Sequence, residues 1–447
     1  TALTADTSRT QAWQTDVTFG NDLLYYSGND AQKMMRYGRI PIILIGLLLG
    51  FYVFRFSREL WGDLAAIIAL TLYSFSPTVL AHTRLVTTDI AAAAAFFISF
   101  YYLYKWLKTP TQRNLWVLGI VFGLSLLTKF STFLLIPIFG LIVTIWWISA
   151  KGGSASGGKK YVSGFAFAII IAFLIVGAVY AFHISNYPAQ KQIVDTTFIL
   201  SSFGVKPLAD FNIWLSSQQY LRAYGHYMLG FLMVLQRSEG GNTTYYLGET
   251  GAAGSWTYFP VVYLIKEPLA YIILLFFAVF LVIKNFRKDF ISSIKNHPAE
   301  TGMLIITFIY WAFSIRSRLN IGVRHILPTL PFIYALTARQ IAYWIQGEGW
   351  GKIKRTAIIL LIIVWAVISV IFVYPSFLAY FNETIGGPGN GYKYVVDSNL
   401  DWGQDILRLA DFIEKNNIKE IKMDYFSGAP AEYYIKNTKI ESYNREV

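Results

Sequence analysis

Three short stretches of the sequence place charged side chains beside long apolar segments. They cover residues 82–89, 128–131 and 316–325. Ionisable groups at membrane helix ends are costly and usually serve a function. The charged residues of interest are Arg84, Asp89, Lys129, Arg316, Arg318, Arg324 and His325.

These residue types suit the binding of a phosphate group. The guanidinium of an arginine can hold a phosphate through two parallel hydrogen bonds, and a lysine adds a compact positive charge. Cations also stabilise a departing phosphate, and a carboxylate such as Asp89 can act as a base or an orienting group. We therefore predict one cationic pocket for a lipid phosphate, with or without chemistry.

Each cluster also has a purely structural interpretation. Asp89 would begin a helix, where a carboxylate caps free N–H groups. Lys129 could reach the membrane surface with its stem in lipid. The arginines of the third cluster could contact lipid headgroups without specificity. Lys266 and Glu267 are interpreted as a structural ion pair. The sequence leaves these alternatives open.

The composition indicates which elements must position the clusters. Of 447 residues, 55% are hydrophobic and 14% are charged, whereas a soluble domain carries about 25% charge. This excludes a cytosolic globular enzyme, a disordered regulator and a nucleic-acid-binding protein, despite the net charge of +12. The absence of cysteine excludes disulfides, thiolate metal sites and cysteine nucleophiles. The remaining fold class is an all-α polytopic membrane protein.

Ten apolar segments are candidates for spanning helices, which need roughly 20 residues each. The segments are 40–56, 64–81, 90–107, 115–127, 132–150, 161–183, 261–283, 302–315, 326–345 and 356–374. Three of them, 115–127, 132–150 and 302–315, are weaker than the others. We therefore expect about ten transmembrane helices.

Basic residues mark alternate connections between these segments. They lie in the short loops 55–58, 105–113, 151–160, 284–295 and 352–355. Positive loops stay in the cytoplasm, so we predict a multi-pass protein of the plasma (inner) membrane. Three larger pieces then lie outside: an N-terminal segment 1–39, the loop 184–260 within a transmembrane domain 40–374, and a tail 375–447. The active site is expected to face this extracytoplasmic side.

The outer pieces carry weaker structural signals. Residues 213–235 are apolar but interrupted by charge, and are expected to form a helix in the membrane interface. The tail is expected to be a small α/β domain with strands at 392–396 and 421–425 and a helix at 402–415.

Two motifs in the outer pieces look functional at first sight. Residues 397–401 resemble the start of a calcium-binding loop, but Gly403 falls one place late and Arg408 stands where a glutamate is required. We therefore expect no calcium site there. Asn242 and Asn382 begin glycosylation sequons that are expected to face outward.

With these residues identified, the chain resembles the GT-C membrane glycosyltransferases. The similarity is to glycosyltransferase family 39, the protein O-mannosyltransferase-like group whose bacterial members are phospholipid carrier-dependent glycosyltransferases. It runs from about Arg39 to the end. The matching stretches are AHTRLVTTDIAAAA, GLSLLTKFSTFLLIP, GSWTYFPVVYLIKEPL, GVRHILPTLPFIY and YFNETIGGPGNGYKYVVDSNLDWGQD.

The resemblance implies roles for several residues. It implies a polyprenyl-phosphate sugar donor and inverting transfer to an acceptor hydroxyl on the outer face. Arg84 and Asp89 match the active-site pair of an outer loop, Lys129 matches a lysine near the donor phosphate, and Arg324 and His325 match a later basic element. Arg316 and Arg318 are weaker candidates for the same phosphate, and Asp89 would support catalysis by orienting Arg84 or the acceptor.

The family also has a first helix followed by an acidic outer loop that supplies the main general base. Nothing before residue 40 resembles that helix or loop. We therefore expect a truncated chain that is inactive as it stands.

Three functions stay open at this point. The first is a glycosyltransferase that moves a hexosyl or pentosyl group to a protein, lipid or glycan. The second is a transporter or flippase for a lipid-linked sugar, which needs the same pocket without transfer chemistry. The third is a structural subunit whose tail binds a partner. The expected site contains no resident metal, although an outer carboxylate could hold a divalent ion.

Overall fold

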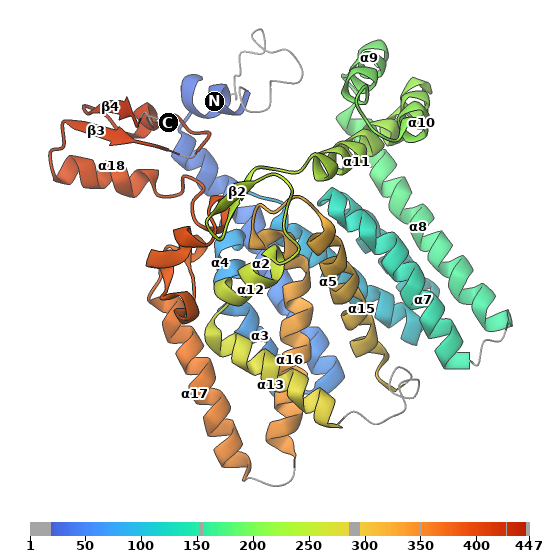
Figure 1. Cartoon of the computed structure of the whole chain (residues 1–447). Helices are drawn as coiled ribbons and strands as arrows, with labels where there is room; N and C mark the ends of the chain where they lie inside the picture. The colour runs from blue at the N-terminus through green and yellow to red at the C-terminus, as the bar shows by residue number, and fades with distance from the viewer. Residues whose placement is uncertain (1–18, 152–154, 286–295, 348–350, 426, 444–447) are drawn as a thin grey trace.

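The computed structural model describes residues 19–151, 155–285, 296–347, 351–425 and 427–443. The first residues of the predicted N-terminal segment lie outside this part, as do portions of the basic loops 151–160 and 284–295. The described chain forms a body of long helices (Figure 1). Shorter helices and a small α/β unit lie at one end of this body.

The helices of the body follow one another with short connections, except that residues 184–257 separate α8 from α12. They are α2 (Ala31–Trp61), α3 (Asp63–Ser74), α4 (Pro77–Thr83), α5 (Asp89–Lys108), α6 (Gln112–Leu126), η3 (Phe130–Leu134), α7 (Leu135–Lys151), α8 (Ala155–His183), α12 (Tyr258–Lys266), α13 (Leu269–Asn285), α15 (Pro298–Arg316), η4 (Val323–Thr329), α16 (Leu330–Gln346) and α17 (Lys352–Ile371). Each predicted span therefore overlaps one or two of these helices. The first helix begins earlier than expected, at Ala31.

The fold class is confirmed as an all-α polytopic membrane protein. Within the described residues, six helices are long and apolar enough to cross a membrane, or up to eight spans if two bent pairs each count as one. Two predicted spans are not among these helices. They correspond to α6 and α16, which have only 15 and 17 residues and so are shorter than the 18 residues required.

The bent pairs have identifiable causes. Between α3 and α4 the axis turns by 63°. There the hydroxyl of Ser76 accepts the N–H of Val79, and Pro77 occupies the first turn of the new helix. Between α12 and α13 the turn is 116°, next to Pro268. A proline ends a helix because it lacks an N–H donor.

Helix α5 forms the centre of the body. Phe96, Phe97, Phe100 and Tyr101 are each at most 1% exposed, and the ring of Phe97 packs 4.9 Å from that of Phe332 in α16. Such complete burial holds the first residue of α5, Asp89, in a rigid frame.

The loop 184–260 contains three helices and a hairpin. These are α9 (Ala189–Ile199), α10 (Lys206–Ser217) and α11 (Arg222–Gly240), followed by the antiparallel strands β1 (Thr244–Tyr246) and β2 (Glu249–Gly251). The single helix predicted at 213–235 is wrong, because the chain breaks between α10 and α11. Neither helix is among those suited to cross a membrane.

The tail begins with four short 3₁₀ turns, η5 (Phe377–Ala379), η6 (Glu383–Ile385), η7 (Pro388–Lys393) and η8 (Asp397–Asn399), and ends in a small α/β unit of α18 (Ile406–Lys415), β3 (Glu420–Met423), α19 (Ala431–Tyr434) and β4 (Lys439–Ser442). Strands β3 and β4 pair in parallel, and the apolar face of α18 packs against α19 and the sheet. The strand predicted at 392–396 is wrong, because the glycines around η7 favour turns.

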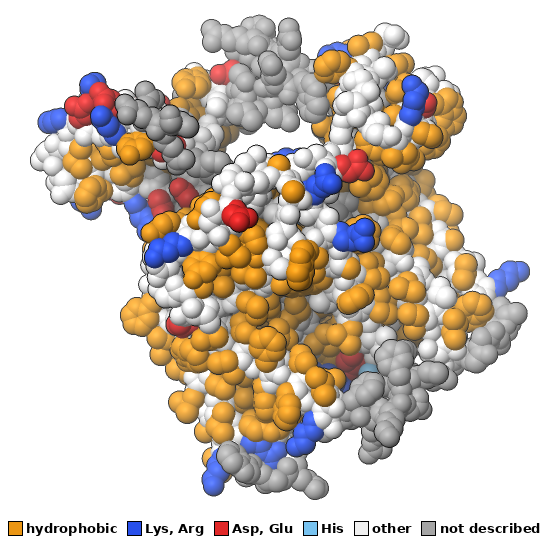
Figure 2. Space-filling model, viewed as in Figure 1, with side chains coloured by type: hydrophobic (Ala, Val, Ile, Leu, Met, Phe, Trp, Pro, Cys, Tyr) orange, Lys and Arg blue, Asp and Glu red, His pale blue; other side chains and the backbone are white. Residues whose placement is uncertain are grey.

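The surface agrees with insertion into a membrane. Figure 2 shows hydrophobic side chains covering the visible side of the helical body, with Lys and Arg gathered above and below this band. The tail and α9–α11 lie at the upper end, whereas α17 begins at the lower end (Figure 1).

Candidate phosphate-binding site

The site is built around a buried carboxylate at the start of α5. The side chain of Asp89 is only 2% exposed, and its Oδ1 accepts a hydrogen bond from Nζ of Lys129 at 2.6 Å. Lys129 lies in the turn between α6 and η3. The positive end of the α5 dipole also favours an anion at this position. The ion pair between Asp89 and Lys129 therefore connects the start of α5 to the start of η3.

Arg324 approaches the same carboxylate from η4. One of its terminal nitrogens lies 3.7 Å from Oδ2 of Asp89. The side chains of Lys129 and Arg324 are 26% and 19% exposed, whereas Asp89 is almost covered. One carboxylate thus faces two cations that both retain contact with solvent. The excess positive charge is available to an anion.

Two histidines surround this cluster. His82 in α4 is fully buried, and neither of its ring nitrogens has a hydrogen-bond partner among the described residues. Nε2 of His325 is also buried without a partner in the same part of the chain. Burial, together with the nearby charges of Lys129 and Arg324, lowers the pKa of His325 to about 3. His325 is therefore neutral at physiological pH and adds no charge to the site.

The tail contributes one side chain that the sequence did not single out. The guanidinium of Arg324 lies over the indole of Trp402, 4.2 Å from the ring centroid. The same indole meets His82 edge to face at 6.2 Å. A Trp in a turn of the tail carries no pattern that would link it to Arg324, so only the folded chain shows this contact.

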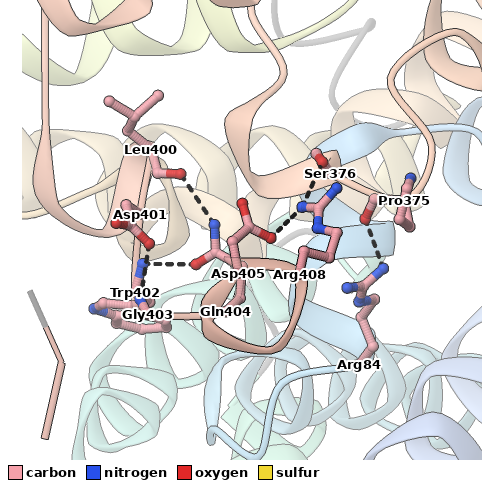
Figure 3. A network of polar contacts seen from close by, with 10 residues as sticks. All are labelled: Arg84, Pro375, Ser376, Leu400, Asp401, Trp402, Gly403, Gln404, Asp405 and Arg408. Carbon is pink, nitrogen blue, oxygen red and sulfur yellow. Dashed lines mark hydrogen bonds and ion pairs between the residues drawn. The ribbon is translucent and has the colours of Figure 1, made fainter. Parts of the chain in front are cut away.

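Arg84 does not contact Asp89. Its guanidinium instead donates a 2.7 Å hydrogen bond to the carbonyl of Pro375. Figure 3 shows this bond beside a second connection, in which Arg408 reaches Ser376 and Asp405. Burial and the nearby charge of Arg39 lower the pKa of the Arg84 guanidinium. In this structure Arg84 connects the end of α4 to the start of the tail.

The remaining arginines of the third cluster also lie apart from Asp89. Arg318 donates to the backbone carbonyl of Glu239 at the end of α11. Arg316 is the last residue of α15, and no contact with Asp89 or Lys129 is seen for it. Of the seven predicted site residues, the structure joins Asp89, Lys129 and Arg324 directly.

Lys266 and Glu267 have a structural role, but not as the expected ion pair. Nζ of Lys266 donates to the carbonyls of Leu378 and Asn399, both at 2.6 Å. Glu267 instead accepts one hydrogen bond from the hydroxyl of Ser76 at 3.2 Å and another from the hydroxyl of Tyr334 at 2.8 Å. Lys266 therefore fastens the tail to α12, and Glu267 connects three helices.

Asn382 likewise supports the tail. It is 1% exposed, and its amide donates to the carbonyls of Leu264 and Glu267 at 2.6 and 2.8 Å. These carbonyls lie at the break before α13, where backbone groups need new partners inside a membrane protein. The asparagine of this sequon, which was expected to face outward, is therefore buried in the folded protein.

The described residues contain no group of three or more His, Asp or Glu side chains that could hold a metal ion. The donors that converge on Asp89 are nitrogens, which bind anions rather than hard cations. Chemically, the arrangement is suited to a negatively charged oxygen group.

The fold defines a multi-pass membrane protein, and three charged side chains meet at the start of one of its helices. Residues 31–177 match the family of dolichyl-phosphate-mannose-protein mannosyltransferases. This match confirms the predicted resemblance to the GT-C membrane glycosyltransferases. It includes Arg84, Asp89 and Lys129 but ends before Arg324 and His325. No curated protein matches the chain.

Proposed function

We propose that this protein transfers a sugar from a polyprenyl-phosphate donor to an acceptor hydroxyl, with inversion, at the extracytoplasmic face of the plasma membrane. The family match supports the general activity, the use of a lipid-phosphate-linked sugar. The observation that carries the proposal is the pair of partly exposed cations, Lys129 and Arg324, held by one buried carboxylate.

The proposed reaction explains why two cations would be needed. The acceptor oxygen attacks C1 of the sugar and the bond from C1 to the phosphate oxygen breaks. The electron pair stays on the polyprenyl phosphate, which leaves as a phosphate monoester, and the proton of the acceptor hydroxyl passes to water. Lys129 and Arg324 stabilise the negative charge that grows on the leaving phosphate.

Asp89 has a positioning role in this proposal. It is 2% exposed and already accepts a hydrogen bond from Lys129, so it is poorly placed to remove the acceptor proton. Instead it holds the two cations close together despite their mutual repulsion. Burial keeps His325 neutral, so it can offer the phosphate a hydrogen bond but no charge.

A panel of radiolabelled donors tests the proposal. Membranes that contain the full-length protein receive polyprenyl-phosphate sugars with a hexosyl or pentosyl group, and the products are separated by extraction and chromatography. We expect label to pass from the lipid to a protein, lipid or glycan acceptor. Movement of intact labelled lipid across the membrane, with no new product, would instead indicate a transporter or flippase.

A further inference from the structure

A distant segment of the tail, residues 398–402, holds the loop before η4 together with the first turn of η4, which carries Arg324. Oδ1 of Asn399 accepts the backbone N–H of Val323 at 2.9 Å. The hydroxyl of Ser398 donates to the carbonyl of Ile321. Ser398 and Asn399 are both fully buried. The backbone just before Arg324 therefore depends on the tail for its hydrogen bonds.

The fit between the two segments is close. Gly322 has a φ of +150°, and a Cβ at this position would lie 2.3 Å from the hydroxyl of Ser398. Only a glycine allows the tail to approach the loop this closely. A glycine here would leave the loop flexible without the tail.

The tail segment is in turn fixed to the membrane body. Its Asn399 carbonyl accepts from the buried ammonium of Lys266, and its side-chain amide donates to the hydroxyl of Tyr258 at 2.8 Å. Both partners belong to α12. The position of the segment is thus set by the body as well as by the tail.

Trp402 extends this contact to the guanidinium itself. The backbone N–H of Trp402 donates to Oε1 of Gln404 at 2.6 Å, which stabilises the turn. Figure 3 shows its indole pointing away from Arg84 and Arg408. Because the indole covers a face of the Arg324 guanidinium, the nitrogens at the guanidinium edge stay free to bind Asp89 and an anion.

We propose that Trp402 is a positioning residue that holds the Arg324 guanidinium in the orientation needed for the donor phosphate. This inference rests on the proposed function for the identity of the anion. Its structural part, the control of Arg324 by an indole from the tail, stands independently. The tail then completes the site instead of only covering it.

Two substitutions of Trp402 distinguish the effect of its aromatic ring from the effect of its apolar volume. Trp402→Leu keeps an apolar side chain but removes the ring, whereas Trp402→Phe keeps a ring for the cation. Trp116→Ala is the control, because Trp116 is a half-exposed residue of α6 that packs against Phe167. Modification of Arg324 by phenylglyoxal is followed by peptide mass spectrometry, with the exposed Arg113 as the internal standard.

We expect Trp402→Leu to speed modification of Arg324 about 5- to 30-fold, the factor that corresponds to a cation–π contact of about 1–2 kcal/mol. Trp402→Phe should restore most of the protection. The kcat for sugar transfer should fall in Trp402→Leu by a similar factor, with the apparent KM for the donor changed much less, because Arg324 stabilises charge that grows as the phosphate leaves. Trp116→Ala should leave both quantities unchanged.

The outcomes distinguish this inference from the proposed function. Unchanged reactivity of Arg324 in Trp402→Leu, or equal effects of Leu and Phe, would overturn the positioning role. Faster modification with an unchanged kcat would retain control of Arg324 by Trp402 but reject the stabilisation of the leaving phosphate by Arg324.

Discussion

Nζ of Lys129 lies 2.6 Å from Oδ1 of Asp89, although the two residues belong to different helical turns and Asp89 is nearly covered. Removing Asp89 leaves Lys129 and Arg324 without their shared counter-charge, and removing Lys129 leaves the buried carboxylate only the more distant Arg324. We expect Asp89→Asn and Lys129→Met each to destabilise the protein. The double variant should cost about 1–2 kcal/mol less than the sum of the two.

Thermal unfolding in detergent measures this coupling. The control is the pair Lys191 and Asp195 on α9, whose ammonium and carboxylate lie 3.1 Å apart but are 50% and 25% exposed. For Asp195→Asn and Lys191→Met we expect a coupling of about 0.5 kcal/mol or less. Equal coupling in the two pairs would argue against a special role for Asp89.

His325 should make the protein sensitive to acid. An unfolded histidine binds a proton below about pH 6.5, whereas burial lowers the pKa of His325 to about 3 in the folded protein. Between these values the unfolded state binds more protons. The free energy of unfolding therefore decreases as the pH falls from about 6.5 toward 3.

The measurement compares the unfolding temperature at pH 7.5 and pH 5.0 in the wild type and in His325→Gln. The loss of stability at pH 5.0 should be smaller in the variant, because glutamine does not titrate. Other titrating groups contribute similarly to both proteins. An identical loss would show that His325 is protonated without cost.

The orientation of the chain can be tested directly, because the sequence has no cysteine. Thr243→Cys places a thiol in the loop 184–260 and Lys354→Cys places one in the basic first turn of α17, and both positions are exposed. In intact cells a membrane-impermeant maleimide should label Cys at 243 but reach 354 only after permeabilisation. The reverse pattern would place the site on the cytoplasmic side.

The helical body was largely predictable from the sequence, because spanning helices require long apolar segments, and such segments are visible in the sequence itself. The sequence does not predict the bend before α4, because residues 64–81 carry no charged side chain and only the pair Ser76 and Pro77 marks the turn. In the tail, the apolar spacing predicted α18, whereas aromatic residues near η7 suggested a strand that the surrounding glycines prevent.

The candidate site was predictable in part. Charges beside apolar segments indicated Asp89, Lys129 and Arg324, and the structure brings these together. Arg84 carries the same signal but bonds to Pro375, because the chain after α17 returns to the end of α4. Trp402 and Asn399 depend on contacts between distant segments, which local patterns do not encode.

Sugar transfer by Arg324→Ala tests the proposed phosphate site most directly, with Arg113→Ala as the matched control at an exposed arginine in the first turn of α6. If Arg324 stabilises the leaving phosphate, its removal should lower transfer from the radiolabelled donor by about 100-fold or more. Membrane insertion and the amount of folded protein should be retained, and Arg113→Ala should transfer at the wild-type rate. Undiminished transfer by folded Arg324→Ala would contradict the proposed phosphate site.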